Sequence, residues 1–128
     1  MEKKAIIPAQ LQNLHDSWHF SPGVLVGDTL YISGVIAVLP DGSVPPNPED
    51  QYVTCFEYIK AVLEEAGGTF DNLVDMVSYH TDLQHSLSQF FEVRDRYVTE
   101  PYPTWTAVGV RELSNRDIVV EIRGIARL

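Results

Sequence analysis

A chain of 128 residues, 45% of them hydrophobic, is long enough for one domain with a buried core, over residues 1–128, and too short for two. Its formal net charge of -9 at pH 7 repels phosphate backbones, so nucleic acid is not an expected partner. No apolar run approaches the roughly 18 residues of a membrane span. The single cysteine, Cys55, cannot form an internal disulfide. Together these features predict a soluble cytoplasmic protein without a membrane partner.

The first predicted element is a β-hairpin. Two short apolar runs, 24–26 and 30–32, flank the pair Gly27 and Asp28, and such a pair favours a tight turn between two strands. The segment 40–48 that follows is rich in proline, which cannot donate a backbone hydrogen bond. This segment is therefore predicted to be a loop.

Two helices with a strand between them are predicted next. In residues 51–66 apolar side chains recur at steps of three and four, which predicts a helix that ends at Gly67 and Gly68. The β-branched and aromatic run 73–81 predicts a strand. A second helix is predicted over 86–98, with a face formed by long side chains: Leu87, Phe90, Phe91, Arg94 and Tyr97.

The end of the chain is predicted to be two strands. Residues 101–103, Pro-Tyr-Pro, interrupt regular structure, and the strands 104–110 and 118–126 are linked by the polar segment 114–117. The order ββαβαββ predicts an α+β fold with a mixed sheet and both helices on one face. The last strand has apolar residues on both faces, so the face without helices is expected to be covered by self-association.

Four segments together resemble the Rid (YjgF/L-PSP-type) family in order and spacing, and the resemblance covers nearly the whole chain from Phe20 onward. They are residues 26–34 (Val-Gly-Asp-Thr-Leu-Tyr-Ile-Ser-Gly), 51–67, 77–82 (Val-Ser-Tyr-His-Thr-Asp) and 103–110 (Pro-Thr-Trp-Thr-Ala-Val-Gly-Val), closed by Val-Glu-Ile at 120–122. The string at 103–110 is most similar to a YjgH-like branch that lacks the family's substrate-binding arginine.

The resemblance implies a chorismate mutase-like fold and a homotrimer whose sheets face a central barrel, with small-molecule clefts between subunits. It also implies an enamine/imine deaminase chemistry that uses no metal and no organic cofactor. In the deaminase branch an arginine binds the substrate carboxylate; the matching position here is Trp105, which cannot offer paired cationic donors. A tyrosine ahead of the first strand is replaced by Phe20.

What remains of the family's site predicts a small-molecule hydrolase acting on a neutral or aromatic imine, enamine or related carbonyl compound. Glu121 is the predicted catalytic residue, because the family's glutamate lies near the attacking water, a role that needs a carboxylate. Trp105 and Phe20 are predicted to form an apolar wall for the substrate. The remaining predicted substrate-binding residues are Ser33, Gly34 and Thr106.

Several simpler interpretations stay open at this stage. Trp105 is equally compatible with interface packing, and Ser33 with a turn that bonds its own backbone. Glu121 has a candidate ion-pair partner in Arg123, two residues along the same strand face. The cleft could also belong to a non-catalytic module that binds a hydrophobic small molecule or a protein partner.

Three further points concern cations and reactive groups. The missing cation could be supplied by a neighbouring subunit, with Arg111, Arg116 and Arg123 as candidates. The histidine pair His15 and His19 lacks the acidic or cysteine ligands that would complete a metal shell, so no metal site is predicted. Cys55 lies on the apolar face of the first predicted helix and is expected to be a buried core residue.

Overall fold

One six-stranded sheet organises the chain, with strand order β1-β2-β3-β6-β4-β5. The computed structural model describes residues 2–128. Strands β4 and β5 are parallel, and the other neighbouring pairs are antiparallel. The elements are β1 (Lys3–Ile6), a 3-10 turn (Ala9–Leu11), α1 (Gln12–Asp16), β2 (Gly23–Val26), β3 (Thr29–Val35), α2 (Pro48–Glu65), a second 3-10 turn (Phe70–Asn72), β4 (Leu73–His80), α3 (Leu83–Arg94), β5 (Thr104–Gly109) and β6 (Val120–Arg127).

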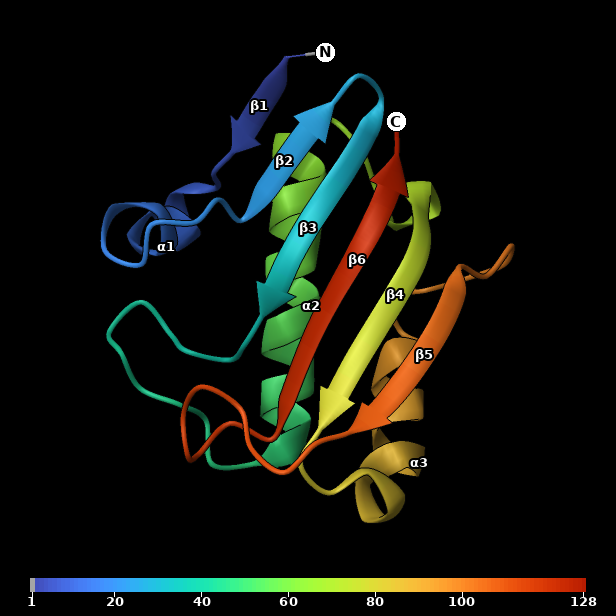
Figure 1. Ribbon diagram of the computed structural model, residues 1–128. Coiled ribbons are helices and arrows are strands. Elements are labelled where there is room, and N and C mark those ends of the chain that lie inside the picture. Colours follow the sequence, from blue (N-terminus) through green and yellow to red (C-terminus); the bar gives the residue numbers. More distant parts are fainter. Residues whose placement is uncertain (1) are drawn as a thin grey trace.

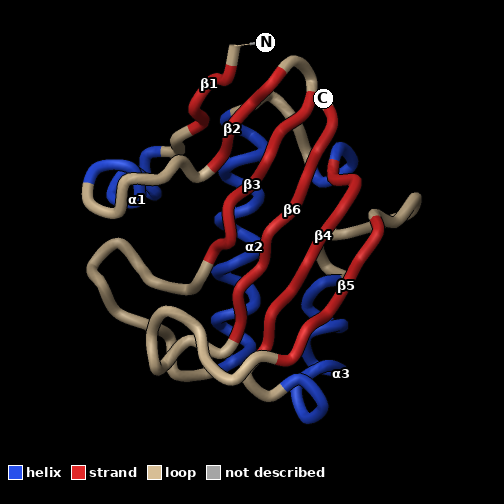
Figure 2. The backbone as a smooth tube through the Cα atoms, in the orientation of Figure 1, coloured by secondary structure: helices blue, strands red, loops and turns tan. Residues whose placement is uncertain are grey.

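The two long helices, α2 and α3, lie on the same face of the sheet, so the predicted α+β fold with a mixed sheet is confirmed (Figures 1 and 2). From β2 onward the order of elements is the predicted ββαβαββ. The core lies between this face and the helices, and its largest fully buried side chains include Tyr52, Phe56 and Phe90. Figure 1 looks onto the opposite face, which no helix covers. Hereafter it is called the open face.

The C-terminal strand β6 lies at the centre of the sheet, between β3 and β4. Its side chains alternate: Val120, Ile122 and Ala126 are buried toward the helices, whereas Arg123 and Arg127 are exposed on the open face. Any group on the open face of β6 is therefore at the middle of the uncovered surface. None of the helices within the described residues is long and apolar enough to cross a membrane.

Helix α2 begins three residues earlier than its periodicity predicts. The side chain of Asn47 accepts a hydrogen bond from the Glu49 amide at 3.0 Å, and Pro48 occupies the first turn. Asparagine caps, early proline and acidic first-turn residues all stabilise a helix N-terminus. The end of the proline-rich segment is thus the helix start, and the predicted loop is shorter at its C-terminal end.

Helix α3 spans 83–94 and not the predicted 86–98. Beyond Arg94 the chain continues in tight turns, with the Tyr97 and Val98 amides both donating to the Arg94 carbonyl. Tyr97 still stacks on Phe56 with ring centroids 5.1 Å apart, so it serves the core without being helical. The apolar spacing therefore extends past the true helix end.

The N-terminal elements β1 and α1 were not predicted from sequence. The predicted order of elements is corrected by adding them before β2. Strand β1 has four residues, two of them lysines, and is held at the sheet edge by pairing with β2. Helix α1 has five residues, none of them buried. Neither segment is long enough to show a hydrophobic period, so local pattern could not reveal them.

Candidate functional site

A β-bulge in strand β3 shapes the first part of the candidate site. The pairing of β3 with β6 shifts between Ile32 and Val35, which leaves Ser33 and Gly34 in the bulge. The Ser33 hydroxyl donates to the Ser21 carbonyl at 2.7 Å, and its amide donates to the Pro22 carbonyl at 2.9 Å. These bonds fasten the loop before β2 to the bulge, so the serine bonds to a distant backbone group and not to its own turn.

Glu121 on β6 lies directly beside this bulge. A side-chain carbon added at Gly34 would overlap the Glu121 carboxylate and would lie 2.9 Å from its carboxyl carbon. Only glycine leaves room for the acid at this point. The structure thus brings Ser33, Gly34 and Glu121 together, as the sequence predicts.

The Glu121 side chain is partly buried, and no ion pair or hydrogen bond within residues 2–128 includes it. Arg123 is exposed on the same face but forms no salt bridge with it, so that simple pairing is not found. Burial raises the pKa of the Glu121 carboxyl above its ordinary value. An unpaired, partly desolvated carboxylate is a chemically available base.

Cys55 lies beneath the same bulge and is not a nucleophile. Its side chain is fully buried, with Sγ 3.5 Å from the Val35 carbonyl. Burial and, secondarily, the charge of Glu121 raise the pKa of the Cys55 thiol, so it stays protonated. The prediction that Cys55 is a core residue is confirmed.

Phe20 precedes β2 in the loop that Ser33 fastens. Its side chain is 40% exposed, and its amide donates to the Leu14 carbonyl at 3.3 Å. The neighbouring Trp18 is 69% exposed. This loop therefore presents aromatic surface to solvent next to the bulge.

Trp105 and Thr106 lie elsewhere, on the edge strand β5. The indole points toward α3, where its ring lies 5.9 Å from Phe90 and 6.2 Å from Phe91. Thr106, the next residue along the strand, is exposed on the other face. Glu121 lies on the open face of β6, between the buried residues Val120 and Ile122, whereas Trp105 faces α3. Within one chain the two residues therefore lie on opposite faces of the sheet, with β4 between their strands.

A buried hydrogen-bond relay fixes the indole. Trp105 Nε1–H donates to the Ser78 hydroxyl at 2.9 Å, and that hydroxyl lies 2.8 Å from His80 Nε2. A hydroxyl donates one hydrogen bond and accepts up to two, so the donor between Ser78 and His80 Nε2 depends on the tautomer of the imidazole. The other ring nitrogen, His80 Nδ1, is buried without a partner among the described residues.

His80 is held neutral by this environment. Only 1% of the residue is exposed, and Phe90 packs edge-on against the imidazole at 4.7 Å. Burial lowers the pKa of His80 to about 4. From sequence, Ser78 and His80 were identified only as part of the motif 77–82, with no predicted role in the site, although their spacing of two on a predicted strand places them on one face.

The cation nearest to Trp105 is Arg94, which the sequence analysis placed on the apolar face of the second helix without a functional role. The guanidinium carbon of Arg94 lies 4.9 Å from the centroid of the indole. An arginine within an apolar helix face was the available signal. None of the three arginines proposed from sequence occupies this place in the chain.

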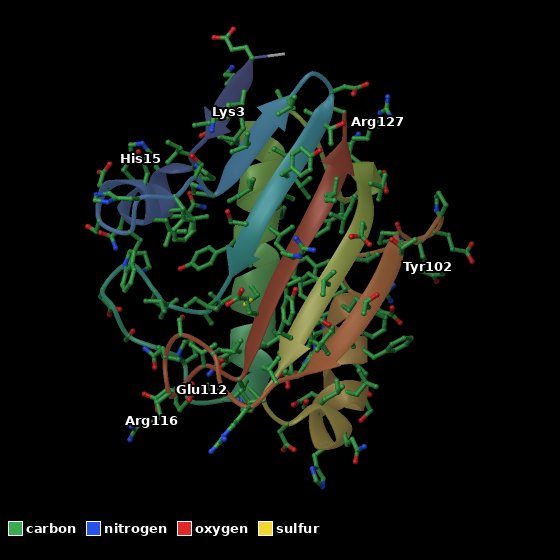
Figure 3. The ribbon with its side chains drawn as sticks, viewed as in Figure 1. Lys3, His15, Tyr102, Glu112, Arg116 and Arg127 are labelled. Carbon is green, nitrogen blue, oxygen red and sulfur yellow. The ribbon has the colours of Figure 1, made fainter. Side chains whose placement is uncertain are left out.

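Arg111 and Arg116 line a separate pocket of about 520 Å³ in the loop between β5 and β6. In Figure 3 the side chain of Arg116 points outward from this loop. Neither Trp105 nor Glu121 borders the pocket. Across residues 2–128 no group of three or more histidine, cysteine or acidic side chains is arranged to hold a metal ion.

Comparison with known proteins gives one consistent result. The family model described as Endoribonuclease L-PSP matches residues 11–128. The RutC family protein YjgH of Escherichia coli K12 is 35% identical over 129 residues, covering 100% of this chain and 97% of its own length. A solved structure of YjgH superimposes with a TM-score of 0.91 at 34% identity, covering 100% of this chain and 98% of that one.

A second relative, TdcF of Escherichia coli K12, is provisionally named a reactive intermediate deaminase and is 32% identical over 108 residues, covering 81% of this chain and 82% of TdcF. A crystal structure of Escherichia coli TdcF with bound serine gives a TM-score of 0.77 at 31% identity, covering 85% and 87% of the two chains. RidA from an Antarctic Psychrobacter gives 0.80 at 35% identity, covering 85% and 88%.

Proposed function

The chain belongs to the Rid family, whose model is described as Endoribonuclease L-PSP, and we propose on this basis that it is a small-molecule hydrolase of the enamine/imine deaminase type. The observation that carries the proposal is Glu121, a partly buried carboxylate with a raised pKa and no partner within residues 2–128, held against a glycine in a bulge. A relative named as a reactive intermediate deaminase supports the same chemistry.

In the proposed reaction Glu121 takes a proton from water as the water oxygen bonds to the imine carbon. Glu121 returns this proton to the imine nitrogen as the C=N double bond opens. The resulting carbinolamine then passes its hydroxyl proton to nitrogen as the C–N bond breaks, which gives a carbonyl compound and ammonia. Atoms balance with one water consumed. A carboxylate whose pKa is raised toward the working pH suits a general base.

We propose that the site is completed across a subunit interface in a homotrimer whose open faces line a central barrel. Tyr31 and Ile125 support this: they face one another on the open face, and Tyr31 is 51% exposed. The separation of Trp105 from Glu121 within one chain also supports it, since a neighbour's β5 edge would bring the two together. Residues 1–128 would act as a single domain, in the cytoplasm.

Of the neutral or aromatic substrates predicted from sequence, we propose an aromatic one, with Trp105 of one subunit and Phe20 of another forming the wall. Ser33, Gly34 and Thr106 would orient the ligand. An uncharged substrate was expected because Trp105 replaces the family's cation. The guanidinium of Arg94 lies against Trp105, so the substrate need not be uncharged.

The test is an assay in which an N-unsubstituted aryl imine is generated in solution and its hydrolysis is measured from the ammonia released. Glu121→Gln is expected to lower kcat by about 100-fold or more, the range typical of losing a general base. Glu64→Gln, at an exposed acid that pairs with Lys60, is the matched control and should keep full activity. Absence of hydrolysis by the wild type, or full activity of Glu121→Gln, would reject the proposal. A tightly bound aromatic ligand that is never turned over would instead favour the non-catalytic binding module.

A further inference from the structure

Arg94 ends helix α3 as an almost fully buried cation. The residue is 5% exposed and its side chain 7% exposed, which is rare for arginine. A cation in the last turn is favoured by the helix dipole, but only where it can stay hydrated or be paired. The environment of Arg94 offers little of either.

Three aromatic rings enclose the guanidinium, and they are called the aromatic box. The guanidinium carbon lies 4.9 Å from the centroid of Trp105 and 5.6 Å from those of Phe91 and Tyr102. Each ring comes from a different segment: α3, the Pro-Tyr-Pro stretch and β5. Cation–π contacts of this kind are favourable, and more so where the cation is desolvated.

The positive charge in the aromatic box is incompletely matched. Its ion-pair partner is Asp95, whose Oδ1 accepts from Nη1 at 3.2 Å while 49% of the aspartate side chain is exposed. The Nε–H group is buried and has no acceptor among the residues that the structure describes. A buried donor and a buried charge left in this way cost free energy that an anion would recover.

The edge of the guanidinium formed by Nε and Nη2 indicates which kind of anion would bind. Nε is buried, and neither Nε nor Nη2 forms a hydrogen bond within residues 2–128. Their two parallel N–H groups are the arrangement that binds a carboxylate through two bonds. Phe91 is 46% exposed and Tyr102 57% exposed, so the rim of the aromatic box offers flat apolar surface beside that edge. The indole N–H is already engaged by Ser78, which leaves Arg94 as the polar donor.

We propose that Arg94 and the aromatic box bind the carboxylate of an aromatic substrate, which deepens the proposed function and rests on it. A monoanion is favoured over a phosphate dianion because Asp95 is adjacent and the chain carries a net charge of -9. Specificity then comes from a helix-borne arginine stacked on Trp105, and not from an arginine on β5.

Binding is measurable without turnover. Trp105 is one of two tryptophans, and Trp18→Phe makes it the sole fluorophore. In that background, titration with benzoate should change the Trp105 emission saturably, whereas benzamide, the uncharged analogue of the same shape, should bind at least about tenfold more weakly. Equal affinity for the two probes, or no binding of benzoate, would overturn the assignment.

Substitutions at Arg94 provide the second arm. Arg94→Met, which keeps an apolar side chain in the aromatic box, should abolish the preference for benzoate, and Arg94→Lys should retain only part of it because lysine lacks the paired donors. Arg96→Met is the matched control, since Arg96 is exposed and bonds to Glu49. Unchanged benzoate affinity in Arg94→Met would also reject the site.

The two proposals fail separately. If aryl imines are hydrolysed in a Glu121-dependent way while benzoate and benzamide bind alike, the function stands and the carboxylate site is wrong. If benzoate binds through Arg94 while no imine is hydrolysed, the site stands and the hydrolase is wrong.

Discussion

At the scale of single residues, Gly34 and Glu121 make one unit. The glycine is required by the space that the carboxylate occupies and not by a special backbone angle, because positive φ values among glycines occur at Gly27, Gly42 and Gly67. The position of the Glu121 carboxylate therefore depends on two residues: on Glu121 itself and on the absence of a side chain at Gly34.

Gly34→Ala tests this unit. The added methyl group must displace the Glu121 carboxylate, so kcat for imine hydrolysis should fall by about tenfold or more while KM changes little. The control is Gly109→Ala, where the new carbon meets Leu83 at an ordinary 3.6 Å. Steady-state kinetics on both variants decide the matter, and an unchanged kcat in Gly34→Ala would show that the acid does not need this position.

The raised pKa of Glu121 has a consequence for stability. Its ionised form is disfavoured in the folded state, so the protein loses stability as pH rises from the ordinary glutamate value of 4.5 through the raised pKa of Glu121. Glu121→Gln should be more thermostable than wild type at pH 7, and the difference in Tm should vanish near pH 4. Exposed Glu112→Gln should show no such trend, and an equal gap at both pH values would contradict the account.

At the scale of elements, helix α3 covers β4 and β5 and buries the hydrogen bonds that connect Trp105, Ser78 and His80. Phe90 of the helix packs against His80 and Trp105, while Ser78 links the two through its hydroxyl. The helix thereby keeps His80 neutral and holds the indole in one orientation. Because one helix buries both strands, the orientation of Trp105 and the protonation of His80 both depend on the packing of α3.

His80 predicts an acid-sensitive packing of α3. With a folded pKa of about 4 against an ordinary value of 6.5, His80 contributes stability that is fully present above pH 6.5 and is lost as pH falls from 6.5 through 4. His80→Gln should lose less stability than wild type between pH 7 and pH 4. Denaturant unfolding at both pH values checks it, with exposed His85→Gln as control; identical losses in His80→Gln and wild type would refute it.

Element positions also show what could be predicted from sequence. The amphipathic run of α2 identified its core face correctly because burial imposes a period on long helices. The last strand was predicted from apolar residues on both faces, whereas in the structure buried and less buried residues alternate along β6. The start of α2 was signalled by Asn47 and Pro48 but masked by the neighbouring prolines. Strand β1 exists only because β2 offers it a partner, a tertiary effect that no local pattern carries.

The candidate site was predictable only in part, for the same reason. Ser33, Gly34 and Glu121 are brought together by the pairing of β3 with β6, as the family resemblance implied. The faces of β5 were not predictable: Trp105 turns toward α3 and meets Arg94, whose place in an apolar stripe resembled packing. Contacts between a helix end and an edge strand depend on the tertiary arrangement and not on sequence spacing.

At the scale of the whole molecule, the proposed site is divided between two regions of the chain. The bulge with Glu121 lies on the open face at the centre of the sheet, where β3 pairs with β6. The aromatic box with Trp105 lies at the β5 edge on the helix side. One protomer cannot join them, because the sheet itself stands between. The proposed homotrimer would join them, since each copy would offer a different half to each neighbour.

Subunit complementation tests this claim most directly. Glu121→Gln and Trp105→Leu proteins, each expected to have low activity on aryl imines, are unfolded together, refolded as mixed particles and assayed. If each site takes Glu121 from one chain and Trp105 from another, random mixing should restore about a quarter of the wild-type sites. Activity no higher than that of the separate variants would contradict a site shared between subunits.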